Sequence, residues 1–168
     1  MAEIALMVIF PVLVIFAGAS DLLTMTIPNK VSLALVAGFL GLAAFGGLPP
    51  SAILLHAAAA GLVLVVTFVF FALGWIGGGD AKLAAAISLW LGFALLPEYL
   101  TVSAVAGGAL TIVVIVLRRV PLPRAAQGWA WLSRIRDAGS GVPYGIALAG
   151  AALAVYPKAE IWTTAFAR

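Results

Sequence analysis

The chain has 168 residues, of which 65% are hydrophobic, nine are basic and six are acidic, and its mean hydropathy is +1.23. This composition excludes an ordinary soluble domain, in which roughly 25% of residues are charged, and it excludes a disordered chain. The absence of cysteine excludes disulfide-stapled modules, zinc ribbons, iron–sulfur clusters and thiol nucleophiles.

The apolar runs predict an all-α polytopic membrane protein with about six transmembrane helices in a single domain, residues 1–168. The stretch from 31 to 79 contains no charged residue. We divide it at the Gly46–Ser51 turn, because glycine and proline there would leave a lipid-facing helix without backbone hydrogen bonds. The predicted spans are 3–20, 31–46, 52–75, 81–97, 99–117 and 142–157. The sequence Ala17-Gly18-Ala19 also resembles a signal-peptide cleavage site, but no basic residue precedes it.

The basic residues predict the orientation of the spans. With both termini outside, the loops after the first, third and fifth spans contain seven of the nine basic residues. This asymmetry is what the positive-inside rule requires, and we read the net charge of +3 as a topology signal rather than as a sign of nucleic-acid binding. The seven residues are Lys30, Lys82, Arg118, Arg119, Arg124, Arg134 and Arg136.

The basic cytoplasmic loop 118–141 is the longest polar segment. Its apolar residues Trp129, Trp131, Leu132 and Ile135 alternate with arginines, which favours a short helix in the headgroup region. An irregular basic loop is the alternative.

Two aspartates are predicted to lie at the same membrane level. Asp21 follows the first span and Asp80 precedes the fourth, so two full crossings separate them. Ionisable residues at membrane depth are costly and are candidates for function. Asp80 could instead cap the helix that begins beside it, whereas Asp21 opposes the dipole of the helix it ends. An exposed ion pair with Arg134 and Arg136 would explain Asp137, which we leave out of the site.

A pair of neighbouring carboxylates suits aspartyl protease chemistry. Two such groups cannot both ionise easily, so one keeps a proton while the other can deprotonate water. The ionised group acts as general base and the neutral one as general acid, with no cofactor or metal. The glycines before Asp80, including Gly77 and Gly79, permit positive φ and let a substrate strand approach closely.

Three sequence elements resemble the landmarks of prepilin leader peptidases, the bacterial GxGD aspartyl proteases. They are Asp21 with Ile27-Pro28-Asn29-Lys30, then Gly77-Gly78-Gly79-Asp80-Ala81-Lys82, and finally Val142-Pro143-Tyr144-Gly145-Ile146-Ala147. The resemblance implies that Asp21 and Asp80 are the catalytic pair. It further implies removal of the short basic leader of pilin-like precursors, at the cytoplasmic face of the bacterial inner membrane.

The chain resembles the short branch associated with Flp-type tight-adherence pili. Longer members have a Cys-x-x-Cys domain linked to N-methylation, and its absence argues against that second activity.

Supporting roles are expected for four further residues. Pro28 and Asn29 should begin the second span, with Asn29 as its cap. Lys82 could act on an aspartate, bind a lipid phosphate or anchor its span. Tyr144 could reach the site or lie in the interfacial aromatic belt. His56 has no partner for metal or triad chemistry, and we assign it no role.

The main alternative is a non-enzymatic transporter or pilus-assembly scaffold. In such a protein the two aspartates would carry protons or pair with Lys30 and Lys82, and acids would be expected near the bilayer midplane. A second alternative is a GxGD protease that cuts inside transmembrane segments. The Ile27-Pro28-Asn29 element and the order of the motifs argue against it.

Overall fold

The computed structural model describes residues 2–121, 128–137 and 139–159, and all regular structure within these ranges is helical. This confirms the all-α prediction. The helices are α1 (Ala2–Thr24), α2 (Asn29–Gly46), α3 (Pro50–Ala72), α4 (Gly78–Arg119), α5 (Ala130–Arg136) and α6 (Tyr144–Val155), followed by a 3-10 turn, η2 (Tyr156–Lys158).

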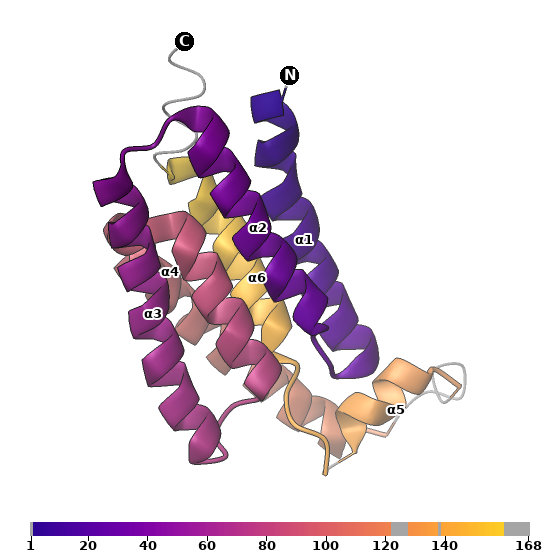
Figure 1. The fold of residues 1–168 in the computed structure, drawn as a ribbon. Helices are drawn as coiled ribbons and strands as arrows, with labels where there is room; N and C mark the ends of the chain where they lie inside the picture. The colour runs from indigo at the N-terminus through magenta and orange to yellow at the C-terminus, as the bar shows by residue number, and fades with distance from the viewer. Residues whose placement is uncertain (1, 122–127, 138, 160–168) are drawn as a thin grey trace.

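The helices form a bundle in which α6 packs against both α1 and α4, α2 lies against α1 and α4, and α3 covers α4 (Figure 1). An aromatic cluster lies at its centre. The ring of Phe10 is 4.2 Å from that of Tyr156 and 5.0 Å from that of Trp90. The Trp90 indole donates to the Leu35 carbonyl at 2.9 Å, which satisfies its buried N–H. Large apolar side chains such as Phe45 and Leu54 are exposed on the outside, as expected for a surface facing lipid.

The helix α4 reverses direction at Gly92. Gly92 has φ +63° and ψ −178°, a conformation essentially restricted to glycine. In Figure 1 both ends of α4 accordingly lie at the lower end of the bundle, with the second near α5. The sequence placed this boundary at Glu98, and that prediction was wrong. Hydropathy detects the charge of Glu98, whereas the turn depends on the backbone freedom of Gly92.

His56 stabilises this reversal. Its Nδ1 lies 2.7 Å from the carbonyl oxygen of Leu89, within the last helical turn before the break. A Cβ on Gly92 would lie 2.9 Å from Cε1 of the His56 ring. The imidazole therefore fills the space that a larger residue at position 92 would need, and His56 has a structural role that the sequence did not show.

We expect Gly92→Ala to destabilise the protein by about 1–3 kcal/mol, because the new methyl group meets the imidazole and the backbone conformation becomes strained. Gly108→Ala is the matched control, since nothing lies within 4 Å of a Cβ there. Thermal unfolding in detergent measures both. Equal stability of the two variants would contradict this role of Gly92.

Three of the described helices are long and apolar enough to cross a membrane, namely α2, α3 and α4, and the apolar part of α1, Val8–Thr24, is shorter. The first limb of α4, residues 78–91, and the 12-residue α6 would rise only about 21 and 18 Å, less than a hydrocarbon core of about 30 Å. Six crossings and the orientation of both termini outside stay predictions.

Within the basic loop the structure contains the short helix α5, so the interpretation as an entirely irregular loop was wrong. Leu132 and Ile135 are buried against the protein rather than turned toward lipid. Residues 122–127 and 138 of this loop lie outside the described residues.

Candidate active site

Asp21 lies in the last turns of α1 and is 5% exposed. Its Oδ2 accepts a hydrogen bond of 2.7 Å from the backbone N–H of Gly145. Gly145 is the second residue of α6, where backbone N–H groups have no partner within their own helix. Asp21 therefore joins the end of α1 to the beginning of α6.

Gly145 is needed for this contact. A Cβ at position 145 would lie 2.8 Å from Asp21 Oδ2 and 2.9 Å from Ile27 Cδ1. Separations below 3.0 Å require atoms to move, and here the neighbours are a buried carboxylate and a packed isoleucine. The sequence quoted Gly145 as part of a motif but gave it no role. Only the structure shows that its missing side chain makes room for Asp21.

Asp80 is the third residue of α4, and its two carboxylate oxygens differ. Oδ2 accepts a bond of 3.3 Å from the N–H of Gly77, the residue before the helix. Oδ1 is buried and has no hydrogen-bond partner within the described part of the chain. Buried polar atoms are normally paired. The capping interpretation therefore explains one oxygen of Asp80 and leaves the other free for a ligand or water.

Asp21 and Asp80 line one cavity of about 400 Å³, and they are close enough to interact electrostatically. The argument from topology predicted that they would meet, and the structure brings them together. The other lining residues come from the segment between α3 and α4, from the residue after α1, and from the segment that leads into α6 together with the first residue of α6. They are Met25, Gly74, Trp75, Ile76, Gly77, Ser140, Gly141, Val142 and Tyr144.

Met25 and Trp75 were not predicted as site residues. Met25 has φ 55°, which is unusual for a residue other than glycine, and it follows the end of α1. Trp75 is 67% exposed at the cavity and its ring lies 5.5 Å from that of Phe70. The positive φ of Met25 has no hydropathy signal, and an exposed tryptophan near a membrane boundary resembles an ordinary interfacial residue.

Arg118 holds in place the segment before α6, which lines one side of the cavity. Its guanidinium donates to the carbonyl oxygens of Ile135 at 2.9 Å, Ser140 at 2.6 Å and Gly141 at 3.0 Å. Arg134 donates to the carbonyl of Leu23, close to Asp21 in α1. The sequence treated Arg118 as a topology signal only and gave Arg134 the further role of an ion-pair partner for Asp137. In the structure both arginines instead fix the surroundings of the aspartates.

The predicted cap at Asn29 was wrong. The N-cap position of α2 is Pro28, with extended backbone, and the helix has no side-chain cap. Instead, Asn29 Oδ1 accepts a 3.0 Å hydrogen bond from Lys82 Nζ. Because the ammonium competes for the amide oxygen, the side chain turns toward α4 rather than back onto its own helix.

The glycines before Asp80 serve packing and capping. A Cβ on Gly79 would lie 3.2 Å from Cβ of Ile27, so this glycine lets α4 approach the turn between α1 and α2. Gly77 supplies the N–H for Asp80, and its φ is −73°, so the positive φ that glycine permits is not adopted at this position.

Tyr144 reaches the cavity wall. Its hydroxyl lies 3.0 Å from Thr111 Oγ1. A Cβ on Gly107 would lie 3.0 Å from Cε1 of the Tyr144 ring, so the absence of a side chain at Gly107 makes room for this ring. The hydroxyl thus joins α6 to the second limb of α4. The described part of the chain shows no hydrogen bond between Tyr144 and either aspartate.

Asp137 is exposed and forms no ion pair with Arg134 or Arg136, so that interpretation was wrong. Its Oδ1 instead accepts a hydrogen bond of 3.1 Å from the backbone N–H of Gly139, so a local turn provides the partner of this carboxylate. Among the residues in the described ranges, no group of three His, Cys, Asp or Glu side chains could hold a metal ion.

The chain also matches the profile of a known protein family. The profile of the type IV leader peptidase family matches residues 8–112, more than half of the chain. The chain belongs to this family. No curated protein and no solved structure matched the chain.

The matched residues contain Asp21, Asp80 and the elements around them, but not the third motif at 142–147. In the structure that motif supplies Gly145, whose N–H binds Asp21, and Val142 and Tyr144, which line the cavity. The resemblance drawn from this third motif thus has a geometric counterpart at the candidate site.

Proposed function

We propose that this leader peptidase is an aspartic endopeptidase in which Asp21 and Asp80 together activate water. The observation that carries the proposal is the shared cavity of about 400 Å³. It brings together Asp21, which is buried, and Asp80, whose Oδ1 is buried, two residues that are 59 positions apart in sequence.

In this proposal one of the two aspartates acts as general base and the other as general acid. Water bound between the aspartates gives a proton to one carboxylate, and its oxygen attacks the carbonyl carbon of the scissile peptide bond. The other, neutral carboxyl then protonates the leaving amine as the carbon–nitrogen bond breaks. Oδ1 of Asp80, which is buried and unpartnered among the described residues, is available for this water, while Asp21 is held by Gly145.

Pilin-like precursors are the proposed substrates, cleaved after their short basic leader at the cytoplasmic face. The family supports a precursor with a leader peptide. The candidate cavity lies at the end of the bundle that carries Arg118 and Arg134, the face predicted to be cytoplasmic. We also propose, on the resemblance of its sequence elements, that the precursor is of the Flp type.

The transporter or scaffold alternative is less well supported. It required Asp21 and Asp80 to carry protons near the midplane or to pair with lysines. In the described part of the chain the one ion pair joins Lys158 to Glu98, and Lys82 binds Asn29 instead of an aspartate. Both aspartates lie near helix ends.

Reporter fusions test the proposed orientation. The end of α4 and η2 lie at opposite ends of the bundle in Figure 1. A reporter fused after Arg119 should therefore be cytoplasmic and one fused after Lys158 should be outside. A cytoplasmic reporter at Lys158 would contradict the N-out, C-out orientation.

The substrate class is tested by incubating the purified protein with a panel of pilin-like precursors and reading the products by mass spectrometry. We expect one new N-terminus just before the hydrophobic segment of a Flp-type precursor. Cleavage inside the hydrophobic segment would instead favour an intramembrane protease.

A further inference from the structure

A second cavity, of about 490 Å³, lies between α2, α3 and α4 and is separate from the candidate active site. Asp80 and Lys82 are two residues apart on α4 and therefore about 200° apart around its axis. Asp80 lines the first cavity and Lys82 the second. The beginning of α4 is thus a wall between the two.

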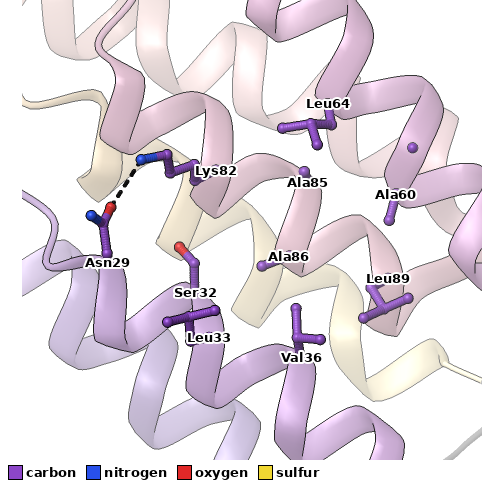
Figure 2. Close-up of a pocket in the computed structure, with 11 residues that line it drawn as sticks. Asn29, Ser32, Leu33, Val36, Ala60, Leu64, Lys82, Ala85, Ala86 and Leu89 are labelled. Carbon is purple, nitrogen blue, oxygen red and sulfur yellow. Dashed lines mark hydrogen bonds between the residues drawn. The ribbon is translucent and has the colours of Figure 1, made fainter.

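This second cavity is a groove, with polar residues at one end and apolar residues along the rest of its length. Figure 2 shows Asn29, Ser32 and Lys82 together at one end. The remaining lining residues are apolar or glycine, namely Leu33, Val36, Ala60, Gly61, Leu64, Ala85, Ala86 and Leu89. Leu33 is 68% exposed, so the groove opens outward to the surroundings of the bundle.

At the polar end, several hydrogen-bond donors have no acceptor within the described residues. Lys82 gives one N–H to Asn29 Oδ1 at 3.0 Å and has no carboxylate partner there. The Asn29 side-chain N–H₂ and the Ser32 hydroxyl have no partner in the same residues. Other helical hydroxyls, such as those of Thr67 and Ser88, bond to the carbonyl four residues earlier. A cation, an amide donor and a hydroxyl together suit an anionic oxygen group.

The dimensions favour an acyl chain over a peptide helix. Along α2 the groove extends from Asn29 to Val36, and along α4 it extends from Lys82 to Leu89. Each stretch rises by seven residues, which corresponds to a length of about 10 Å. Its volume of about 490 Å³ then gives a mean cross-section of about 50 Å². An α-helix with side chains, 10–12 Å in diameter, occupies roughly 80–110 Å².

We propose that this groove binds one phospholipid with a net negative headgroup, its acyl chain lying along α2 and α4 and its phosphate at Lys82, Asn29 and Ser32. The polar groups lie in the first turns of α2 and α4, at the level where headgroups meet helix ends. The proposal does not depend on the proteolytic mechanism, and its test measures binding rather than cleavage.

Native mass spectrometry of the purified full chain, titrated with phosphatidylglycerol or phosphatidylcholine, tests the proposal. Wild-type protein should bind phosphatidylglycerol about fivefold more tightly, the contribution of one lysine near a membrane surface. Lys82→Met should remove this preference. Equal affinity of the wild-type protein for both lipids would overturn the proposal.

Filling the groove provides the matched pair of variants. Nothing lies within 4 Å of a Cβ on Gly61, so Gly61→Leu should fold normally and place its side chain in the groove. We expect it to weaken the binding of both lipids at least tenfold. Gly108→Leu, equally open but outside the groove, should bind as the wild type does. Indistinguishable binding by the two leucine variants would overturn the proposal.

Photocrosslinking gives a second measurement that does not depend on variants. Phosphatidylglycerol with a photoreactive acyl chain should crosslink to Val36, Leu64 and Leu89. Labelling confined to the exposed Phe68 and Phe71 of α3, or displacement of the lipid by the hydrophobic segment of a precursor, would overturn the assignment of the groove to lipid.

Discussion

Asp21→Asn and Asp80→Asn should each abolish processing of a pilin-like precursor. Asparagine keeps the size and the hydrogen-bond acceptor, so the bond from Gly145 to position 21 and the bond from Gly77 to position 80 can persist. What is lost is the ability to exchange a proton with water, and general acid–base catalysis contributes about 10²–10⁴-fold in rate. Cleavage by the purified variants, normalised to the amount of protein in the membrane, measures the loss.

Asp137→Asn is the control for this prediction. Its side chain is exposed and its Oδ1 accepts the Gly139 N–H, a role that asparagine can also perform. We expect nearly unchanged turnover. If Asp80→Asn cleaved at the wild-type rate, Asp80 would be only a helix cap. An inactive Asp137→Asn variant at normal abundance would show that the wrong pair had been chosen.

Gly145→Ala should reduce cleavage by about 10²-fold. The added methyl group would lie 2.8 Å from Oδ2 of Asp21 and 2.9 Å from Ile27, so the carboxylate or α6 must move. A displacement of about 1 Å at a reacting group can cost 10²-fold in rate. Precursor cleavage by purified protein measures the effect.

Gly150→Ala lies on the same helix, and nothing is within 4 Å of a Cβ there, so this variant should cleave normally. Wild-type activity of Gly145→Ala would mean that the contact between α6 and Asp21 has no part in catalysis.

The sequence predicted the general architecture and the proximity of the aspartates because both depend on strong signals. Long apolar runs specify helices, and α1, α2 and α3 begin and end within a few residues of the predicted limits. Charges are so rare in this chain that two aspartates at equivalent levels were conspicuous. Their common cavity follows from how the helices return through the bundle.

The boundary within α4 could not be read from hydropathy. Glu98 is charged, but it lies at the bundle surface and forms an exposed ion pair with Lys158. The chain turns at Gly92, where the requirement is a positive φ and a neighbouring imidazole. Neither has a periodic or compositional signature, and the glycines at 107 and 108 lie within a continuous helix.

The partners of the supporting residues also required tertiary structure. Lys82 and Asn29 are 53 positions apart, and local rules favour a cap for the asparagine and an anchor for the lysine. Arg118 resembled other basic residues of a cytoplasmic loop until its three carbonyl partners were visible. Contacts between distant segments decide these roles, and a single sequence does not specify them.

The most direct test of the two-aspartate mechanism compares the double variant Asp21→Asn/Asp80→Asn with both single variants in single-turnover cleavage of a pilin-like precursor. Residues that act as a unit give strongly non-additive losses, so we expect the double variant to be no slower than either single variant. If the two losses multiplied, or if either single variant retained most of its activity, Asp21 and Asp80 would not share one catalytic step.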